Sequence, residues 1–272
     1  TSGGDKNTPI QVSFGSGLTA TSIYAGGHHT CAILSDGSVK CWGRNEFGQL
    51  GIGTTINTNT PTTVNTLGAG RSAISLALAW DSTCALLDDG SVKCWGKREH
   101  GQLGDGSTIG ATSSPPSNPI SFGAGRTAKM ITAGEFHYCA ILDNDEIMCW
   151  GDGANGKLAT GSTADQTTPT APSGAFAAGR YAVYIDAGYH HTCAILDNGH
   201  GTCWGSDANG QLGNGATTGD ILSLHTGHLA WNAMAISAGG SHTCMQVDKP
   251  GDNHQHERIK CWGSRGSGQL GD

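Results

Sequence analysis

Ten cysteines are the residues of this 272-residue chain with the clearest capacity for chemistry, and they fall into five local pairs. The first members of the pairs recur every 51 to 55 residues, and four pairs share an internal spacing of ten. The pairs are Cys31 and Cys41, Cys84 and Cys94, Cys139 and Cys149, Cys193 and Cys203, and Cys244 and Cys261. Thiols paired this regularly are suited to disulfides, which form in oxidising compartments.

The twelve histidines are the second such group, because imidazole serves as a general base and as a metal ligand. One set lies two residues before the first cysteine of each pair, at His29, Ser82, His137, His191 and His242. A residue that almost every repeat uses at one place indicates a structural hydrogen bond rather than a catalyst. His254 and His256 differ, because alternate residues of an extended strand share a face, and they are weak candidates for a divalent metal site; an exposed polar loop is the alternative.

The residues between the paired cysteines predict a β-hairpin that brings the two sulfurs together. In the first repeat the loop is 35–37, and Gly37 supplies the left-handed backbone position that a three-residue loop needs. Counting outward from this loop places Cys31 directly opposite Cys41, within disulfide reach. Asp145 replaces the loop glycine in the third repeat, and Asp tolerates that conformation.

The fifth hairpin is longer than the others by seven residues, and we predict that residues 249–258 form its exposed tip. The cross-strand arrangement of the cysteines favours disulfides over two alternatives. Buried reduced thiols would act as small apolar side chains. A zinc site would need cysteines from two repeats, and the chain has no pair of cysteines separated by two residues.

The whole chain is built from five copies of this unit, each ending in a Gly-Gln-Leu-Gly type element. The repeats cover approximately 1–51, 52–104, 105–159, 160–213 and 214–272, as a single region. A total of 44 glycines and only 14% charged residues suit an all-β protein with many tight turns. Stretches rich in Thr, Ser and Pro at 54–63, 107–119 and 162–172 indicate polar surface loops, either O-glycosylated or plain.

Residues 25–51 resemble the repeat of the regulator of chromosome condensation family, in which Gly-x-x-His-Thr leads through Asp-Gly and Trp-Gly to Gly-Gln-Leu-Gly. The resemblance covers the chain and implies a β-propeller with about four antiparallel strands in each blade. Familiar members close with seven blades, whereas this chain has five repeats. Either five blades close a ring or the chain is a segment of a longer array, which we favour. The Cys-Trp-Gly step resembles a secreted or surface branch of the family.

Composition and motifs narrow the function. A net charge of −7 argues against a nucleic-acid partner, and no apolar run is long enough for a membrane span. Hydrolase, phosphate-loop, zinc-protease and EF-hand motifs are missing from the sequence. We therefore predict a non-catalytic extracellular scaffold or binding module of a surface, adhesive or filamentous protein, without a cofactor. Its expected partners are proteins or glycans at the cell surface, or other copies of itself.

Two alternatives for the function follow from the resemblance. Related propellers bind protein partners through loops, so the chain is alternatively a secreted protein-binding inhibitor. The founding member of the family is an exchange factor for a small GTPase, which gives the second alternative. That role depends on loops outside the repeat consensus, and no motif of this sequence corresponds to those contacts.

Overall fold

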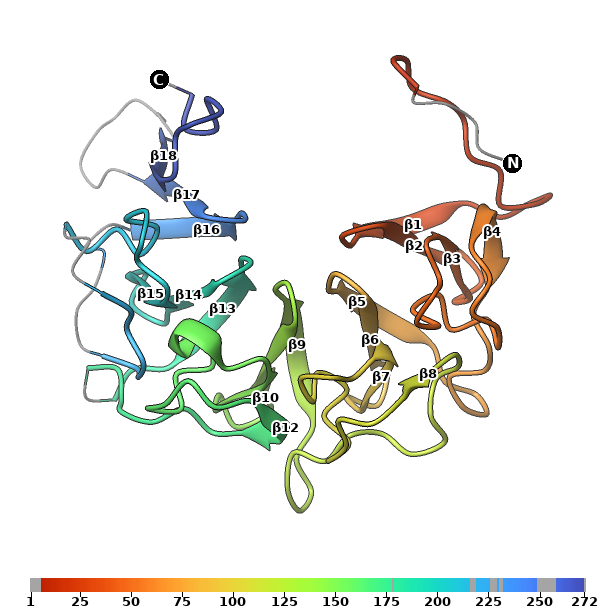
Figure 1. Cartoon of the computed structure of the whole chain (residues 1–272), viewed down its shortest axis with the longest axis horizontal. Helices are drawn as coiled ribbons and strands as arrows, with labels where there is room; N and C mark the ends of the chain where they lie inside the picture. The colour runs from red at the N-terminus through yellow and green to blue at the C-terminus, as the bar shows by residue number, and fades with distance from the viewer. Residues whose placement is uncertain are drawn as a thin grey trace.

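The computed structural model describes residues 6–177, 179–215, 219–225, 229, 232–248 and 258–271. Five antiparallel sheets follow one another along the chain, and Figure 1 shows them side by side in an open arc with the first and last sheets at its ends. Among the described residues, three sheets have four strands and two have three, which confirms the all-β prediction with about four strands in each blade. Within the described ranges, no helix is long and apolar enough to cross a membrane.

Each sheet is a meander in which consecutive strands are hydrogen-bonded neighbours. The first strands of successive sheets contact one another, so they line the inner side of the arc. The strands of the first two sheets are β1 (Ala20–Ala25), β2 (His29–Leu34), β3 (Val39–Gly43), β4 (Thr58–Thr63), β5 (Ala73–Leu78), β6 (Ser82–Leu87), β7 (Val92–Lys97) and β8 (Ala111–Thr112). Those of the third sheet are β9 (Ala128–Ala133), β10 (His137–Leu142), β11 (Ile147–Gly151) and β12 (Gln166–Thr170), with the short 3-10 helix η1 (Ala154–Gly156) after β11. The last two sheets contain β13 (Ala182–Ala187), β14 (His191–Leu196), β15 (Gly201–Gly205), β16 (Asn232–Ala238), β17 (His242–Asp248) and β18 (Arg258–Gly263).

The second and third strands of each sheet have the register that the cysteine spacing predicts. In the first sheet Cys31 lies opposite Cys41, and the same pairing recurs in the other four sheets. Gly37 has a φ of 80°, and Asp145, which takes its place in the third repeat, has a φ of 70°. The sequence-based hairpin is therefore confirmed, including the substitution of Asp for Gly at a left-handed position.

The outer strands differ from the sequence-based expectation. β4, β8 and β12 lie inside the Thr-rich stretches that were expected to be loops. β-branched Thr residues favour extended backbone, and the proline in β4 is tolerated because an outermost strand leaves one row of amides unpaired. Each four-stranded sheet therefore takes its outer strand from the beginning of the next sequence repeat.

The hydrophobic core is divided among the junctions between neighbouring sheets. In the first junction Leu50 of the first sheet packs in one cluster with Leu76 and Trp95 of the second. Trp95, Trp150 and Trp204 are completely buried at successive junctions. A single sheet cannot bury its apolar face alone, so the sheets depend on stacking, as repeat proteins do.

Candidate binding surface

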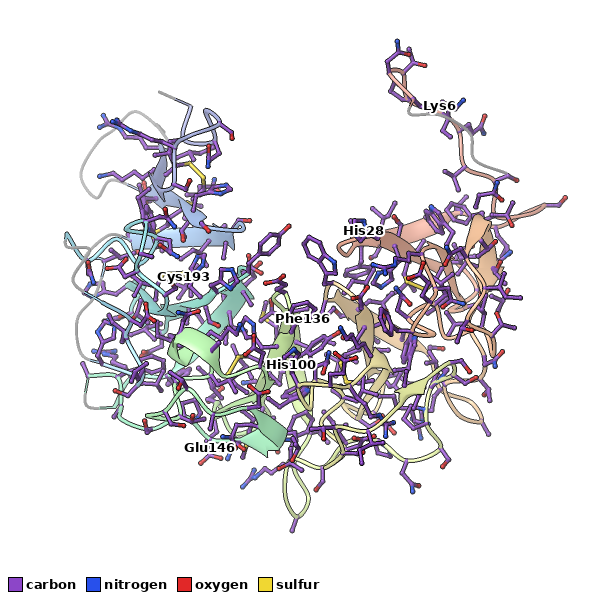
Figure 2. All side chains as sticks on the ribbon, viewed as in Figure 1. Lys6, His28, His100, Phe136, Glu146 and Cys193 are labelled. Carbon is purple, nitrogen blue, oxygen red and sulfur yellow. A yellow bond between two sulfur atoms is a disulfide. The ribbon has the colours of Figure 1, made fainter. Side chains whose placement is uncertain are left out.

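The ten cysteines lie on the second and third strands of the five sheets, bonded in the five pairs named above. The S–S distances are 2.04 to 2.13 Å, and each bridge joins strands of one sheet. Figure 2 shows these sulfur–sulfur bonds within the sheets, with Cys193 labelled. The bridges therefore fix the hairpins that carry the contacts between neighbouring sheets.

The histidine column forms hydrogen-bonded joints between sheets. His29 Nε2 lies 2.8 Å from Thr83 Oγ1 of the next sheet, and the Thr83 hydroxyl donates to the Gln49 carbonyl at 2.8 Å. The Trp95 indole donates to that same carbonyl at 3.0 Å. Because the threonine proton is committed to the carbonyl, the histidine Nε2–H must be the donor in its contact with Thr83. His29 is thus a structural hydrogen-bond donor, which agrees with the structural role that the sequence predicts for this column.

The same joint recurs twice more along the arc. His137 Nε2 lies 3.0 Å from Thr192 Oγ1, and His191 Nε2 lies 2.8 Å from Thr243 Oγ1. Burial lowers the pKa of His191 to about 4, and burial together with His28 lowers that of His29 to about 4. The pKa of His137 lies well below its usual range for the same main reason. These imidazoles are neutral near pH 7 and are sealed from solvent, which is unsuitable for a catalytic base.

One joint uses different residues. Between the second and third sheets Ser82 replaces the histidine and Tyr138 replaces the threonine, and their oxygens lie 2.8 Å apart. Tyr138 is completely buried and stacks on Trp150 at a centroid distance of 5.8 Å. A short residue paired with a long one thus spans this junction, whereas a long residue paired with a short one spans the others.

The turns between the first and second strands of the sheets converge at one face of the arc, where they line a cavity of about 330 Å³. Trp80 of the second sheet and Tyr189 of the fourth meet there edge to face, with ring centroids 5.5 Å apart. His28 of the first sheet lies edge-on to Trp80 at 5.2 Å. Figure 2 shows His28 and Phe136 on the inner side of the arc, where these turns lie. We call Trp80, Tyr189, His28, Glu135 and His190 the channel mouth.

The channel mouth combines aromatic rings with a carboxylate. Glu135 of the third sheet lies between the two aromatic residues in sequence order, and its Oε2 is 3.7 Å from His190 Nδ1. The backbone N–H of Trp80 donates to the Glu135 carbonyl at 2.9 Å, which fixes the two turns relative to each other. Tyr189 is 43% exposed. Exposed aromatic rings beside a carboxylate form a preorganised environment for a cationic group.

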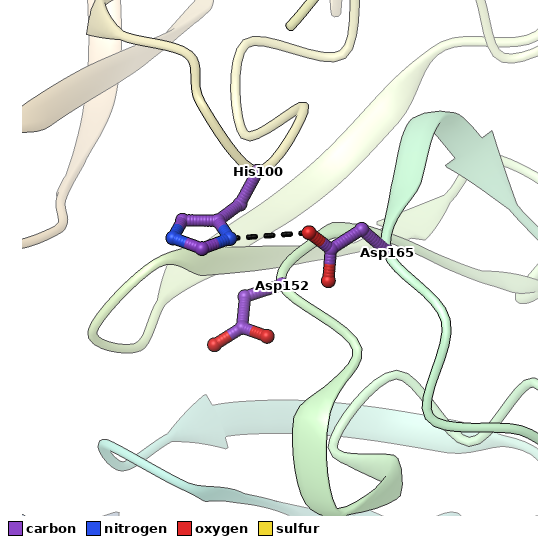
Figure 3. A group of neighbouring side chains, drawn as sticks. All are labelled: His100, Asp152 and Asp165. Atoms are coloured by element: carbon purple, nitrogen blue, oxygen red, sulfur yellow. Dashed lines mark hydrogen bonds and ion pairs between the residues drawn. The ribbon is translucent and has the colours of Figure 1, made fainter.

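A second polar cluster lies where the second and third sheets meet, and Figure 3 shows its three side chains. His100, Asp152 and Asp165 each offer one ligand atom, and these atoms lie within 4.8 Å of one another. His100 Nδ1 is 3.1 Å from Asp165 Oδ2, while the buried Lys157 ammonium bonds to Asp152. Although burial opposes it, hydrogen bonds from Lys157 and the Ala154 N–H lower the pKa of Asp152. Because an ammonium already neutralises Asp152, the cluster is an ion-pair network rather than three free ligands.

His254 and His256, the metal-site candidates from the sequence, lie outside the described residues. Residues 249–257 of the expected hairpin tip lie outside them as well. The channel mouth was not predicted from the sequence. The sequence does contain a signal for it. The two residues that precede each position of the histidine column differ from repeat to repeat, whereas the residues around them recur. These two-residue segments are Gly27-His28, Trp80-Asp81, Glu135-Phe136, Tyr189-His190 and Gly240-Ser241.

The sequence matches profiles described as "Regulator of chromosome condensation (RCC1) repeat". One profile matches residues 36–86, 89–141 and 144–195, which together make up more than half of the chain. A second profile matches residues 20–49, 74–102, 130–157 and 182–211. The matched segments contain the paired cysteines, the histidine column and the Trp-Gly steps of the first four sheets.

Individual proteins show the same similarity. The "Ultraviolet-B receptor UVR8" of Arabidopsis thaliana is 29% identical over 269 residues, which are 98% of this chain and 58% of the receptor. The human "E3 ubiquitin-protein ligase HERC2" is 32% identical over 81% of this chain and 4% of the ligase. The crystal structure of human WBSCR16 superimposes with a TM-score of 0.77 at 20% identity, covering 88% of this chain and 60% of that one. The chain therefore spans little more than half the length of the receptor, and the WBSCR16 likeness shows the fold.

Proposed function

Because the chain belongs to the regulator of chromosome condensation (RCC1) repeat family, we propose that it is a non-catalytic extracellular scaffold whose channel mouth binds a cationic side chain of a protein partner. We further propose that residues 1–272 act as one propeller region of a surface or adhesive protein. The relatives reported above are a receptor and a ligase with a much longer chain, and neither name assigns catalysis to the repeats. The five intrasheet disulfides support an oxidising, extracellular location.

The channel mouth is the observation that carries this proposal. Its aromatic rings come from two sheets that are not neighbours in sequence, so the site exists only when the arc is assembled. The Glu135 carboxylate and a net charge of −7 favour a positively charged partner group over an anionic one. A Lys or Arg side chain fits these requirements, because its cation interacts with both the ring faces and the carboxylate.

Measuring how tightly the oxidised chain binds to an array of peptides and glycans tests the proposal. We expect the oxidised chain to bind peptides rich in Lys and Arg, and Trp80→Ala, Tyr189→Ala and Glu135→Gln each to weaken binding at least tenfold. Tyr181→Ala is the matched control, because Tyr181 is 42% exposed and lies before β13, at the opposite end of that strand from Tyr189. Binding that is equally weakened by Tyr181→Ala, or no preference for basic peptides, would contradict the proposal.

Exchange-factor activity is the outcome that would favour the second alternative. Acceleration of nucleotide release from a small GTPase, retained after the disulfides are reduced, would indicate an intracellular role. We expect no acceleration, because no motif of this sequence corresponds to the contacts of the exchange factor.

A further inference from the structure

Lys157 carries a nucleophilic amine at a position where the other repeats have glutamine. Its counterparts are Gln49, Gln102, Gln211 and Gln269. The side-chain carbonyl of each of these glutamines accepts a hydrogen bond from the backbone N–H two residues earlier. A lysine side chain has no acceptor, so Lys157 cannot make this contact. The lysine must therefore have a different role from the glutamines that it replaces.

The Lys157 ammonium is buried with fewer acceptors than it has donors. Its side chain is 1% exposed, and Asp152 Oδ2, at 2.5 Å from Nζ, is its one hydrogen-bond partner among the described residues. An ammonium has three N–H donors, and a buried ion pair has lost the hydration of both its charges. An amide that joined the two side chains would have a single N–H donor and no charge. The buried surroundings therefore favour the loss of water from this ion pair.

Asp152 departs from the repeat together with Lys157. Its counterparts directly after the Trp-Gly step are Arg44, Lys97, Ser206 and Ser264, so the third repeat alone combines a carboxyl here with an amine at position 157. Asp152 Cγ lies at most about 3.7 Å from Lys157 Nζ, because it is one carbon–oxygen bond away from Oδ2. Reacting atoms about 3 to 3.5 Å apart are in a near-attack arrangement. The amine and the carboxyl therefore need little movement to react.

Groups that assist such a reaction lie around Asp152. The backbone N–H of Ala154 donates to Asp152 Oδ1 at 2.9 Å, and this oxygen gains negative charge when an amine attacks Cγ. The Asp165 carboxylate is held by the Gly153 N–H at 3.0 Å and by His100 Nδ1 at 3.1 Å. One ligand atom each of His100, Asp152 and Asp165 lie within 4.8 Å of one another, and Figure 3 shows the three side chains together. An oxyanion donor and a proton acceptor are thus both beside the pair.

We propose that the Lys157 amine and the Asp152 carboxyl condense to an intramolecular amide, with the loss of one water molecule. A proton of the Lys157 ammonium moves to Asp152 Oδ2, and the resulting amine attacks Cγ. The Nζ–Cγ bond forms as a second Nζ proton passes to Asp165. The Cγ–Oδ2 bond then breaks, and Oδ2 takes this proton back from Asp165 and leaves as water. Oδ1 becomes the amide oxygen, and the third proton stays on Nζ, so atoms and charges balance without another reactant.

The amide closes residues 152–157 into a ring beside the junction between the third and fourth sheets. The Lys157 backbone carbonyl accepts hydrogen bonds from the Thr192 hydroxyl at 2.9 Å and from the Trp204 indole at 3.0 Å. The bond therefore fixes the segment that carries the acceptor of this junction, as the disulfides fix the hairpins, but reducing agents do not open it. The inference is independent of what binds at the channel mouth.

Mass spectrometry of the 272-residue chain, folded under oxidising conditions and then reduced, tests the proposal. We expect the reduced chain to be lighter than its sequence by the mass of one water molecule. Trypsin does not cleave after an acylated lysine, so residues 130–180 should appear as one peptide that carries the whole mass deficit. Fragmentation of this peptide should locate the deficit in the ring of residues 152–157.

Lys157→Gln is the matched control, because it restores the residue of the other repeats and should have the full mass. This variant also separates the amide from a succinimide at Asp152-Gly153, which loses one water molecule without involving the lysine. Asp165→Asn keeps both reacting groups but removes the proton acceptor, so we expect a folded chain without the mass deficit. Circular dichroism of each variant establishes that it is folded.

Three results would overturn the proposal. They are a full mass for the unmodified chain with complete cleavage after Lys157, a deficit that persists in Lys157→Gln, and a deficit that lies outside residues 152–157. An Asp165→Asn chain that forms the amide completely would contradict the role given to Asp165. Binding of basic peptides by Lys157→Gln is expected to equal that of the unmodified chain, so the scaffold proposal stands or fails separately.

Discussion

The junction between the second and third sheets differs from the other described junctions in the residues that cross it. Elsewhere a buried histidine donates to a threonine hydroxyl, as in His191 and Thr243. Here Ser82 meets Tyr138, which is completely buried. The two solutions preserve a polar contact across the junction while exchanging a large residue for a small one on each side. What the junction requires is therefore a filled volume and a satisfied hydrogen bond, and not an imidazole.

The largest expected effect comes from truncating Tyr138, the large residue at the junction between the second and third sheets. Tyr138→Thr removes a buried ring that stacks on Trp150 and leaves the Ser82 hydroxyl without its partner. We expect a loss of about 3 to 5 kcal/mol in the free energy of unfolding, the usual range for truncating a buried aromatic side chain. Denaturant unfolding followed by tryptophan fluorescence measures it. A loss below about 1 kcal/mol would show that the ring is not part of the joint.

The second prediction uses pH to separate the two kinds of joint. His29 and His191 have an ordinary pKa of 6.5 when unfolded and a pKa of about 4 when folded. The unfolded state therefore binds more protons between these values, so stability is complete above about pH 6.5 and falls as the pH decreases towards 4. The loss is roughly 3 kcal/mol for each histidine across the whole window.

Unfolding midpoints at pH 7.5, 6 and 5 check this prediction, and His191→Gln provides the comparison. Its stability should fall less steeply with acidity than that of the unmodified chain. An identical pH dependence for the two proteins would mean that the imidazole is not a buried neutral donor. The joint of Ser82 and Tyr138 has no group that titrates in this window.

The third prediction contrasts contacts between sheets with bonds inside a sheet. Replacing Cys84 and Cys94 by alanine removes a bridge from one hairpin without touching the hydrogen bonds of the neighbouring joints. We expect a loss of roughly 2 to 3 kcal/mol, because the bridge closes only a short loop. Thermal unfolding measures it, and the matched pair at Cys139 and Cys149 should give a similar value. A much larger loss at one site would indicate that the bridge also holds a junction.

The smallest effect is expected at a feature that repeats as regularly as the histidines. Arg71, Arg126 and Arg180 each pair with an aspartate of the adjacent hairpin loop. The Arg126 side chain is 43% exposed. We expect Arg126→Ala to cost less than about 0.5 kcal/mol, because exposed ion pairs are screened by water. A loss above about 1.5 kcal/mol in thermal unfolding would contradict this interpretation.

The hairpins were predictable because a cysteine pair and a loop glycine determine the register locally. The role of the histidine column was also predictable, since its position repeats with the fold. The contact between Trp80 and Tyr189 was not, because it joins sheets two apart and depends on the curvature of the arc. The exchange at Ser82 and Tyr138 was not predictable either, since the sequence does not show that these residues face each other.

A double-mutant cycle at positions 82 and 138 tests most directly whether the repeated polar residues are interchangeable joints between sheets. The single changes Ser82→His and Tyr138→Thr should each destabilise the protein, by overfilling and by emptying the junction. The combined variant rebuilds the histidine–threonine pair of the other joints, so we expect it to recover most of the loss, with a coupling energy of about 2 kcal/mol or more. Additive losses, within about 0.5 kcal/mol, would contradict the account.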